Sequence, residues 1–414
     1  MSSAPGTAEP GADLPVTLDD VLAARRLLQG VSRLTPLETS RPLAERVGGP
    51  VHLKCENLQR AGSFKIRGAY TRISRLSSQE RAAGVVAASA GNHAQGVALA
   101  ARELGAAATV FMPYGAPIPK VEATRAYGAE VVFSGHTVDE SLRAALEHAE
   151  GTGAVLIHPF DHPDIVAGQG TVGLEILEQC PDLRTLVVGT GGGGLLAGIA
   201  VAVKSRRPDV TVIGVQAEEA AAYPASLAAG HPVALDRMAT MADGIAVGCP
   251  GTVPFALVRA LVDDIVTVSE ESLSRALLLL LERAKLVVEP AGAAAVAALL
   301  DEPRAFEPPV VAVLSGGNID PLLLLRVLRH GLAAAGRYLS FRVRLTDRPG
   351  ALARLLVSVA EADASVLEVE HVRTDPKLRV DEVDVALQLE TRGAEHCDQL
   401  LALLRAQGYR LVFG

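Results

Sequence analysis

The sequence lacks the features that mark membrane, nucleic-acid-binding and secreted proteins. Its apolar runs, such as Leu277 to Leu281, end in charge or proline well short of the roughly 20 residues that span a bilayer. With 39 basic and 47 acidic residues the net charge is -8, and no dense Lys/Arg block occurs, so we expect no nucleic-acid partner and no membrane association. The 414 residues predict an ordinary globular protein of two or three domains.

Cysteine is scarce and shows no pattern. Cys55, Cys180, Cys249 and Cys397 have no paired spacing, which argues against a disulfide framework and a structural zinc site. A reducing cytoplasm fits this composition best. Residues 1–15 contain Pro, Gly and acidic residues but no apolar core segment, so we expect a loose tail there and not a signal peptide.

Lysine is rare as well, with six among the 39 basic residues. Lys65 stands in the run SFKIRG at residues 63–68, between a small hydroxyl residue and an apolar stretch that ends in glycine. An amine forms a Schiff base only when it is partly deprotonated, and burial beside Phe64 and Ile66 promotes this by disfavouring the ammonium form. The hexapeptide alone allows either a Schiff-base lysine or a surface lysine that starts a helix.

The strongest local signal is the glycine-rich turn GTGGGGL at residues 189–195, between an apolar strand and a helical stretch. Glycines let backbone N–H groups converge on an anion, and the helix N-terminus adds partial positive charge. The residues expected to hold a phosphate are Gly191, Gly192, Gly193, Gly194 and Leu195. The same letters satisfy G-x-G-x-x-G, with Glu218 at about the distance, roughly 20 residues, of a ribose-binding acid, so a nicotinamide-dependent dehydrogenase remains open here.

Two further polar loops follow strands. The loop SAGNH at residues 89–93 supplies a hydroxyl, backbone donors and an amide, so it could bind a carboxylate while Asn92 bonds a ring oxygen. A serine that caps a helix and an asparagine in a turn would explain the same residues without a ligand. The expected substrate contacts are Ser89, Ala90, Gly91, Asn92 and His93. Ser315 follows the strand at residues 311–314 and places a hydroxyl where a sheet-bound ligand would meet it. Together, these loops and Lys65 fit pyridoxal phosphate better than any other cofactor.

The chain order predicts an α/β fold with a separate C-terminal domain. From Gly84 onward strands alternate with helices, as in a doubly wound, mainly parallel sheet covering residues 16–335, with a smaller subdomain at about 54–160. Strands are expected at residues 85–88, 109–112, 130–133, 185–188, 210–216 and 310–314. Residues 338–414 show a βαββαβ, ferredoxin-like order. There we expect strands at 340–346, 366–373, 382–389 and 409–413, helices at 351–362 and 394–407, and a turn at Asp375-Pro376.

Several of these segments, in order through residues 16–330, resemble the threonine ammonia-lyases, also called threonine dehydratases. The matching segments are residues 57–70, 89–96, 160–171, 191–195, 288–293 and 315–318. That family has the tryptophan-synthase-β-like fold of fold-type II pyridoxal phosphate enzymes. The resemblance implies that Lys65 carries the cofactor beside Phe64, Asn92 contacts its 3-oxygen, the glycine turn holds its phosphate and Ser315 faces its pyridine nitrogen. Glu289 either lines the site or caps the following helix.

The resemblance implies α,β-elimination of L-threonine to 2-oxobutanoate and ammonia, in which Lys65 takes the α-proton and the β-hydroxyl leaves. L-Serine is expected as a second substrate, because a pocket discriminates one methyl by only roughly 1 to 3 kcal/mol. The alternatives are a serine or hydroxyaspartate dehydratase or racemase on the same fold, and an amino-acid sensor with an inert catalytic half.

No metal site is expected. Racemases that resemble this chain bind a divalent ion through acidic residues where Gln216 and Ala222 stand here. His158 and His162 are four residues apart, but the neighbouring prolines deny them a common helix, so a structural loop is the better interpretation.

The C-terminal part resembles an ACT domain, whose strand-to-helix turn matches DRPGAL at residues 347–352. Gly350 lets the backbone approach a bound amino acid, and the helix N-terminus suits its carboxylate. The expected effector contacts are Asp347, Gly350, Ala351 and Leu352. A homo-oligomer, dimer or tetramer, regulated by an amino acid is therefore expected, with a ligand-free dimerisation module as the alternative.

Overall fold

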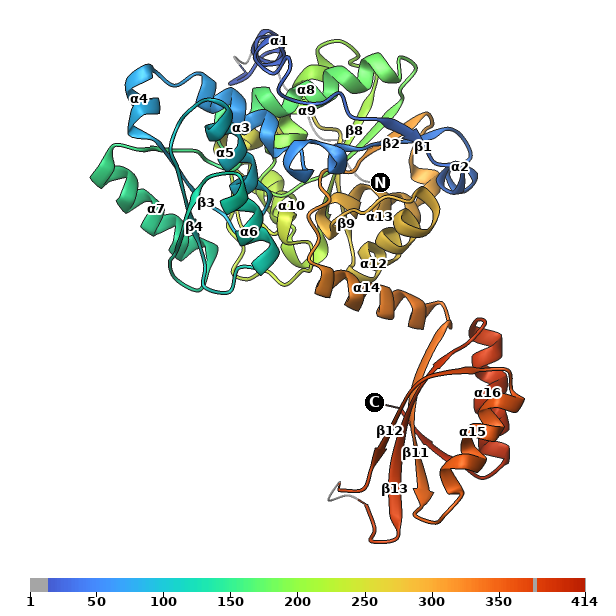
Figure 1. The fold of residues 1–414 in the computed structure, drawn as a ribbon. Coiled ribbons are helices and arrows are strands. Elements are labelled where there is room, and N and C mark those ends of the chain that lie inside the picture. Colours follow the sequence, from blue (N-terminus) through green and yellow to red (C-terminus); the bar gives the residue numbers. More distant parts are fainter. Residues whose placement is uncertain (1–13, 375–377, 414) are drawn as a thin grey trace. The chain divides into compact units, whose positions relative to one another are not determined.

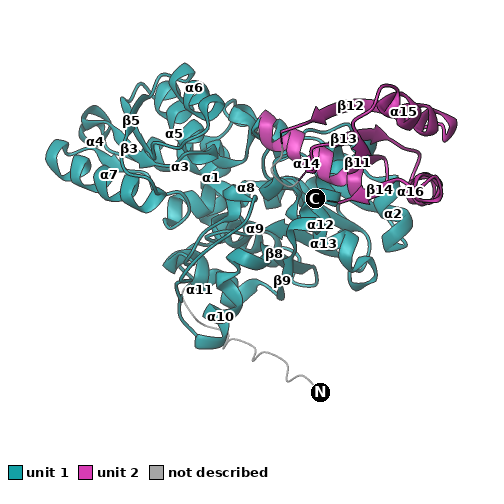
Figure 2. Ribbon diagram, turned by 90° about the horizontal axis from the view of Figure 1, so that it is seen from below, with its two compact units in different colours: residues 1–320 teal, residues 321–414 magenta. Residues whose placement is uncertain are grey.

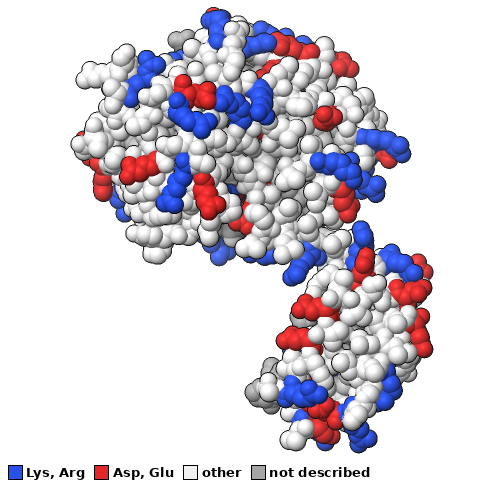
Figure 3. Space-filling view, viewed as in Figure 1, with Lys and Arg blue, Asp and Glu red and all other residues white. Residues whose placement is uncertain are grey.

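The computed structural model describes residues 14–374 and 378–413 and shows two compact units, residues 1–320 and 321–414 (Figure 1, Figure 2). Most of the tail expected at residues 1–15, and the turn expected at Asp375-Pro376, lie outside the described residues. Within them, no helix has both the length and the apolar character needed to cross a bilayer. On the face seen in Figure 3, acidic and basic side chains are interspersed.

The larger sheet of the first unit has six strands in the order β1-β2-β10-β7-β8-β9. All neighbours are parallel except β1 and β2. The two central strands β10 and β7 are buried along their whole length, as expected when helices cover both faces of a parallel sheet. The strands are β1 (Leu37–Thr39), β2 (Val51–Lys54), β7 (Thr185–Gly189), β8 (Thr211–Ala217), β9 (Asp264–Val268) and β10 (Val310–Val313).

The smaller sheet of the same unit is fully parallel, in the order β5-β4-β3-β6. Helices α5 (Asn92–Glu103) and α7 (Val138–Thr152) pack against β3 and β4 (Figure 1). The two sheets confirm the expected doubly wound α/β architecture with a smaller subdomain. The strands are β3 (Val85–Ala88), β4 (Ala108–Met112), β5 (Glu130–Phe133) and β6 (Val155–Leu156).

Helix starts and packing follow from local sequence. Thr17 and Asp20 form a capping box at the start of α1, because each side chain bonds the other's backbone N–H. Helix α3 packs against both α5 and α8 and so joins the helical layers of the two sheets. The remaining helices of the unit are α1 (Leu18–Leu27), α2 (Arg41–Val47), α3 (Lys65–Ser74), α4 (Ser78–Ala83), α6 (Ile118–Ala126), α8 (Pro163–Gln179), α9 (Gly194–Lys204), α10 (Ala222–Ala229), α11 (Thr252–Leu261), α12 (Glu270–Leu279) and α13 (Pro290–Asp301).

The second unit has the expected βαββαβ order and an antiparallel sheet ordered β12-β13-β11-β14. This is the ferredoxin-like topology. Its elements are α14 (Pro321–Ala334), β11 (Tyr338–Thr346), α15 (Ala351–Glu361), β12 (Ser365–Val372), β13 (Glu382–Glu390), α16 (Ala394–Ala406) and β14 (Arg410–Val412). The division at Asp320 lies earlier than the expected junction near residue 335, because α14 packs against β11 and groups with the second unit.

Candidate active site

Lys65 lies at the first position of α3, immediately beyond the ends of the central strands. The turn before it is tied to the loop after β10, since Ser63 forms a β-bridge with Gly316 and the Phe64 N–H donates to the Ser315 carbonyl at 3.2 Å. The carboxyl ends of parallel strands are where open α/β sheets bind ligands. The expected lysine and the expected hydroxyl residue therefore meet at one edge of the larger sheet.

The Lys65 side chain is half-buried and has few partners. Its Nζ donates to the Pro159 carbonyl at 2.9 Å and lies 5.2 Å from the centre of the Phe64 ring. Burial lowers the pKa of Lys65 to about 8, and the nearby Glu289 carboxylate opposes that shift. A substantial fraction of this amine is therefore neutral near physiological pH, as nucleophilic and proton-accepting roles require.

The glycine-rich turn between β7 and α9 is packed so closely that side chains are excluded. A Cβ on Gly192 would lie 2.5 Å from the Phe160 ring, and a Cβ on Gly193 would lie 1.8 Å from the Tyr223 hydroxyl oxygen. Gly193 also has a φ of +96°, which favours glycine. The turn leads directly into the first N–H groups of α9, which have no partner within the helix. This cradle of backbone donors fits a phosphate group.

Two buried hydroxyls near Lys65 add to this fit. The Ser63 hydroxyl is buried and has no hydrogen-bond partner among the described residues. Ser315 is also buried, at the end of the strand β10 that pairs with β7. A buried polar group without a partner is uncommon in native proteins and indicates a site completed by a ligand. The residues present therefore fit pyridoxal phosphate.

Asn92, Glu289 and Asn318 form a polar chain from three separate segments. The Asn92 amide donates to the Glu289 carboxylate, and Asn318 donates to the Asn92 carbonyl oxygen at 2.7 Å. Glu289 is the N-cap residue of α13, but its side chain makes no capping bond and instead lines this group. Burial, and then the negative charge of Asp243, raise the pKa of Glu289 to about 7. This carboxyl group can thus hold or release a proton near neutral pH.

The loop at residues 89–93 forms a tight turn at the start of α5. The Ser89 hydroxyl accepts a hydrogen bond from the Gly91 N–H at 3.1 Å. The His93 side chain is buried and bonds the Ile157 carbonyl at 2.7 Å, and burial together with nearby Lys65 lowers its pKa to about 3. The His93 ring is therefore held neutral, with Nε2 directed at the Ile157 carbonyl.

A fully buried ionic cluster supports the other side of α3. The Arg67 guanidinium donates to both oxygens of Glu56, at 2.8 Å each, and to both oxygens of Glu175, at 2.6 and 3.0 Å. Lys54 reaches the same Glu175 at 2.6 Å. The cluster ties β2, the short helix η1 (Glu56–Leu58), α3 and α8 together beneath Lys65. The sequence analysis did not identify it.

A second ion pair, between Lys120 and Asp243, was also missed. Lys120 lies in α6 beside the smaller sheet, and Asp243 lies in the short helix η4 (Asp243–Ile245) of the larger one. The rarity of lysine, which drew attention to Lys65, applied equally to Lys120. Position 120 has no glycine-rich or hydroxyl neighbour to suggest a role.

The residues weighed as metal ligands have other tasks. The His158 ring nitrogen Nδ1 accepts from the Asp161 N–H at 2.8 Å, and the His162 Nδ1 caps α8 by accepting from the Asp164 N–H at 3.1 Å. These bonds confirm a structural loop. Gln216 is buried and accepts from the Tyr223 N–H at 2.9 Å. Across residues 14–374 and 378–413, no three His, Cys, Asp or Glu side chains gather as metal ligands.

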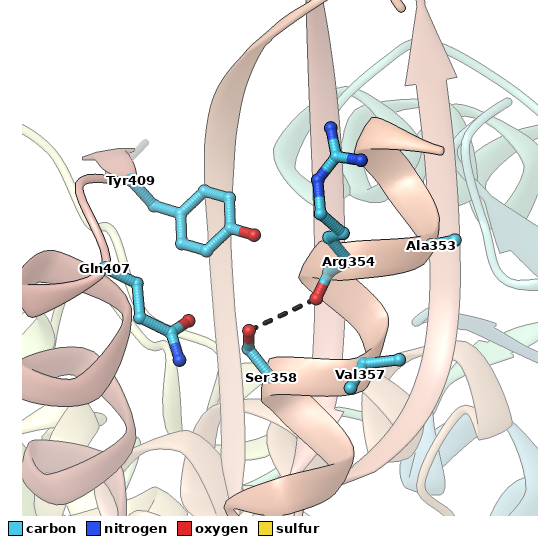
Figure 4. Close-up of a pocket in the computed structure, with 6 residues that line it drawn as sticks. All are labelled: Ala353, Arg354, Val357, Ser358, Gln407 and Tyr409. Atoms are coloured by element: carbon cyan, nitrogen blue, oxygen red, sulfur yellow. Dashed lines mark hydrogen bonds between the residues drawn. The ribbon is translucent and has the colours of Figure 1, made fainter. Parts of the chain in front are cut away.

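In the second unit, a hollow of about 420 Å³ lies between α15 and the end of α16 (Figure 4). Figure 4 shows Tyr409 and Gln407 facing α15 across it, where Ser358 bonds the Arg354 carbonyl at 3.1 Å. Of the expected effector contacts, Gly350 caps α15 with a φ of +82°, and Ala351 and Leu352 follow in the first turn. The exposed Asp347 is paired with Arg373 at 2.9 Å. Effector binding at this turn stays a prediction.

Comparisons with known proteins agree with this site. Residues 28–316 match the model of the family described as "Pyridoxal-phosphate dependent enzyme". The L-threonine ammonia-lyase of Thermotoga maritima is 48% identical over 396 residues, which are 96% of this chain and 99% of that protein.

Two solved structures are also similar. A threonine deaminase from T.th. has a TM-score of 0.70 and 44% identity, over 73% of this chain and 99% of that one. Maize serine racemase has a TM-score of 0.72 and 34% identity, over 77% and 99%. The chain therefore belongs to the pyridoxal-phosphate dependent enzymes, in the threonine ammonia-lyase family.

Proposed function

We propose that this protein is an L-threonine ammonia-lyase that converts L-threonine to 2-oxobutanoate and ammonia. The observation that carries the proposal is that Lys65 and the glycine cradle at residues 191–194 lie at the same edge of the larger sheet. The pKa of Lys65 is lowered to about 8, which suits a reactive amine. The relative named L-threonine ammonia-lyase, similar along 96% of the chain, supports threonine as the substrate.

Bound pyridoxal phosphate supplies an electron sink that acidifies the α-C–H bond of an amino acid joined to it. The backbone N–H groups of residues 191–195 bind its phosphate, and the Ser315 hydroxyl and the Asn92 amide orient its ring. The loop at residues 89–93 binds the substrate carboxylate through backbone donors. Lys65 Nζ accepts the α-proton, which its lowered pKa permits, and the β-hydroxyl then leaves.

Two observations count against the dehydrogenase and the metal-dependent racemase as alternative functions. The nicotinamide interpretation needs a pyrophosphate turn but gives no role to Lys65 and its unpartnered neighbour Ser63. A racemase of the metal-dependent kind needs acidic residues where buried Gln216 bonds the backbone of Tyr223. L-Serine remains a proposed second substrate, since the maize serine racemase shares 34% identity with this chain.

We further propose that residues 14–320 form the catalytic domain and residues 321–413 an ACT-type regulatory domain that binds an amino acid near residues 347–352. The ferredoxin-like topology of the second unit supports this. A homo-oligomer is also proposed, since most oligomers of globular proteins are symmetric assemblies of identical chains. The four free cysteines support a reducing, cytoplasmic compartment.

The test is a 2-oxo acid assay with L-threonine, L-serine and hydroxyaspartate, each repeated with isoleucine or valine. We expect threonine to give the highest kcat/KM and one of the two effectors to change it. If hydroxyaspartate were the one compound turned over, it would be the substrate in place of threonine. A visible absorbance band abolished by borohydride excludes the dehydrogenase, and absence of turnover with every substrate would favour the sensor.

A further inference from the structure

Three buried or half-buried lysines of the first unit differ in how completely their ammonium groups are paired. Lys54 donates to three acceptors, the Thr35 carbonyl, Glu175 and Gln179, at 2.9, 2.6 and 2.9 Å. Within the described part of the chain, Lys65 has one acceptor and Lys120 has one, Asp243. An ammonium group has three donors, so Lys120, only 7% exposed, keeps donors without a protein partner.

The incomplete pairing of Lys120 coincides with its place in the site. A Cβ built on Gly91 would lie 3.9 Å from Lys120 Nζ, which sets the amine against the loop expected to hold the substrate carboxylate. Its partner Asp243 starts η4. The next residue, Gly244, would direct a Cβ to within 3.5 Å of the Glu289 carboxylate, and Ile245 contacts Gly191 of the phosphate cradle.

We propose that Lys120 is a substrate-binding residue whose ammonium group pairs with the carboxylate of the amino-acid substrate. This inference rests on the proposed function, because it assigns a ligand to the same site. It places a positively charged side chain beside a loop whose own donors, the backbone N–H groups, the Ser89 hydroxyl and the Asn92 amide, carry no charge.

The charges around Lys120 select a carboxylate as its ligand. Asp243 and Glu289 are both acidic, so an incoming carboxylate meets repulsion unless a cation lies beside it. Lys120 bonds Asp243, and its positive charge also reaches Glu289, where it opposes the rise in the pKa of that carboxyl group. In a hydroxyamino acid the carboxylate is the one permanently negative group, and a buried ammonium bonds such a group more strongly than a neutral hydroxyl.

The decisive experiment compares an acid with its amide in the holoenzyme. L-Alanine and L-alaninamide can join the cofactor but lack a β-leaving group, so cofactor absorbance reports their dissociation constants without turnover. Lys120→Met keeps the length of the side chain and removes its charge. We expect L-alanine to bind about 10- to 100-fold more weakly in this variant, with L-alaninamide changed by less than about twofold. KM for L-threonine should rise by a similar factor.

Two controls separate binding from structure. Lys204→Met removes a lysine that pairs with Asp263 at 2.7 Å at the end of α9, and it should change neither constant. Asp243→Asn breaks the ion pair but keeps the Lys120 charge, so the preference for the acid over the amide should persist.

Three results would overturn the inference. Equal weakening of L-alanine and L-alaninamide binding in Lys120→Met would show a purely structural role. Loss of the preference for the acid over the amide in Asp243→Asn would make the ion pair, and not the Lys120 charge, the functional unit. If Lys120→Met does not fold, Lys120→Gln and Lys120→Arg replace it, and an unchanged acid preference in Lys120→Gln contradicts the inference. A wild-type protein that binds L-alanine through Lys120 without deaminating threonine would reject the proposed reaction and retain this inference.

Discussion

Two charged regions lie on either side of the first turn of α3, and they differ in how fully they are paired. On one side of the helix, Arg67 bonds Glu56 and Glu175, and Lys54 shares Glu175. The donors of this buried cluster meet acceptors at 2.6 to 3.3 Å. At the sheet edge, the one hydrogen-bond acceptor of Lys65 Nζ among the described residues is the Pro159 carbonyl. The first arrangement stabilises the fold as it stands, whereas the second is completed by a ligand.

The contrast teaches that burial alone does not identify a functional lysine. Lys54 is fully buried, more so than Lys65, yet its three acceptors leave no donor for a ligand. Incomplete pairing is the more informative property, because an unsatisfied buried donor costs free energy that a bound ligand offsets.

Removing the incompletely paired Lys65 should have the largest effect. Lys65→Ala deletes the proposed proton acceptor and cofactor attachment, so we expect kcat to fall on the order of 10³-fold or more and the visible absorbance band to disappear. Absorbance spectra and the 2-oxo acid assay measure both, with Lys204→Ala as the control at a lysine that is paired with Asp263. Normal turnover in Lys65→Ala would remove the distinction between the two regions.

Breaking the fully paired cluster should instead lower stability. Arg67→Met leaves Glu56 buried without its directly bonded cation and leaves Glu175 with Lys54 alone. Breaking a buried ion pair in this way typically destabilises a protein by about 3 to 5 kcal/mol. Denaturant unfolding of the cofactor-loaded protein measures the change. Arg25→Met removes an exposed partner of Glu178 and should cost no more than about 1 kcal/mol. Equal losses for the two variants would contradict the structural role of the cluster.

A side chain added to a glycine of the phosphate cradle should be tolerated less well than one added to an exposed glycine. In Gly192→Ala the new Cβ would meet the Phe160 ring at 2.5 Å, so the loop must shift, and overpacking of this kind costs about 1 to 3 kcal/mol. We expect cofactor affinity to fall by about 10-fold or more in equilibrium dialysis. Gly151→Ala, in α7 with open space around it, should leave affinity unchanged and raise stability slightly. Unchanged cofactor affinity in Gly192→Ala would argue against a phosphate in this turn.

The smallest predicted effect is a shift in titration. Burial lowers the pKa of Lys65 from 10.5 to about 8 against the opposing Glu289 carboxylate, so acylation of Lys65 in the cofactor-free protein should have its midpoint near pH 8. Glu289→Gln removes negative charge that stabilises the ammonium form, so the midpoint moves to lower pH. Mass spectrometry of the Lys65 peptide across neutral and alkaline pH follows this shift. A midpoint that rises in Glu289→Gln would reverse the assigned electrostatics.

The sequence predicted the parts of the fold that local patterns determine. The strands at Val85–Ala88 and Glu130–Phe133 match to the residue, because short apolar runs between turn residues leave little freedom. The short strands β1 and β6 were not predicted, since pairing with distant strands creates them. The sequence prediction placed the domain junction near residue 335, whereas residues 321–334 group with the second unit, where α14 contacts β11.

The candidate site divides in the same way. Loops with a local signature, such as residues 189–195, could be identified from their letters. Lys120, Asp243 and the Arg67 cluster could not, because their partners lie far apart along the chain: 123 residues separate Lys120 from Asp243, and 108 separate Arg67 from Glu175. The burial of the His93 ring against Ile157 could not be predicted either, because it comes from packing and not from the motif.

The most direct test is reduction of the cofactor-loaded protein with borohydride, followed by peptide mass spectrometry. The role proposed for Lys65 predicts a single phosphopyridoxyl adduct on this residue. Lys54, whose three acceptors occupy its donors, and Lys120, which is held in an ion pair with Asp243, should stay unmodified. An adduct on Lys54 or Lys120, or a visible band that survives reduction, would contradict that role.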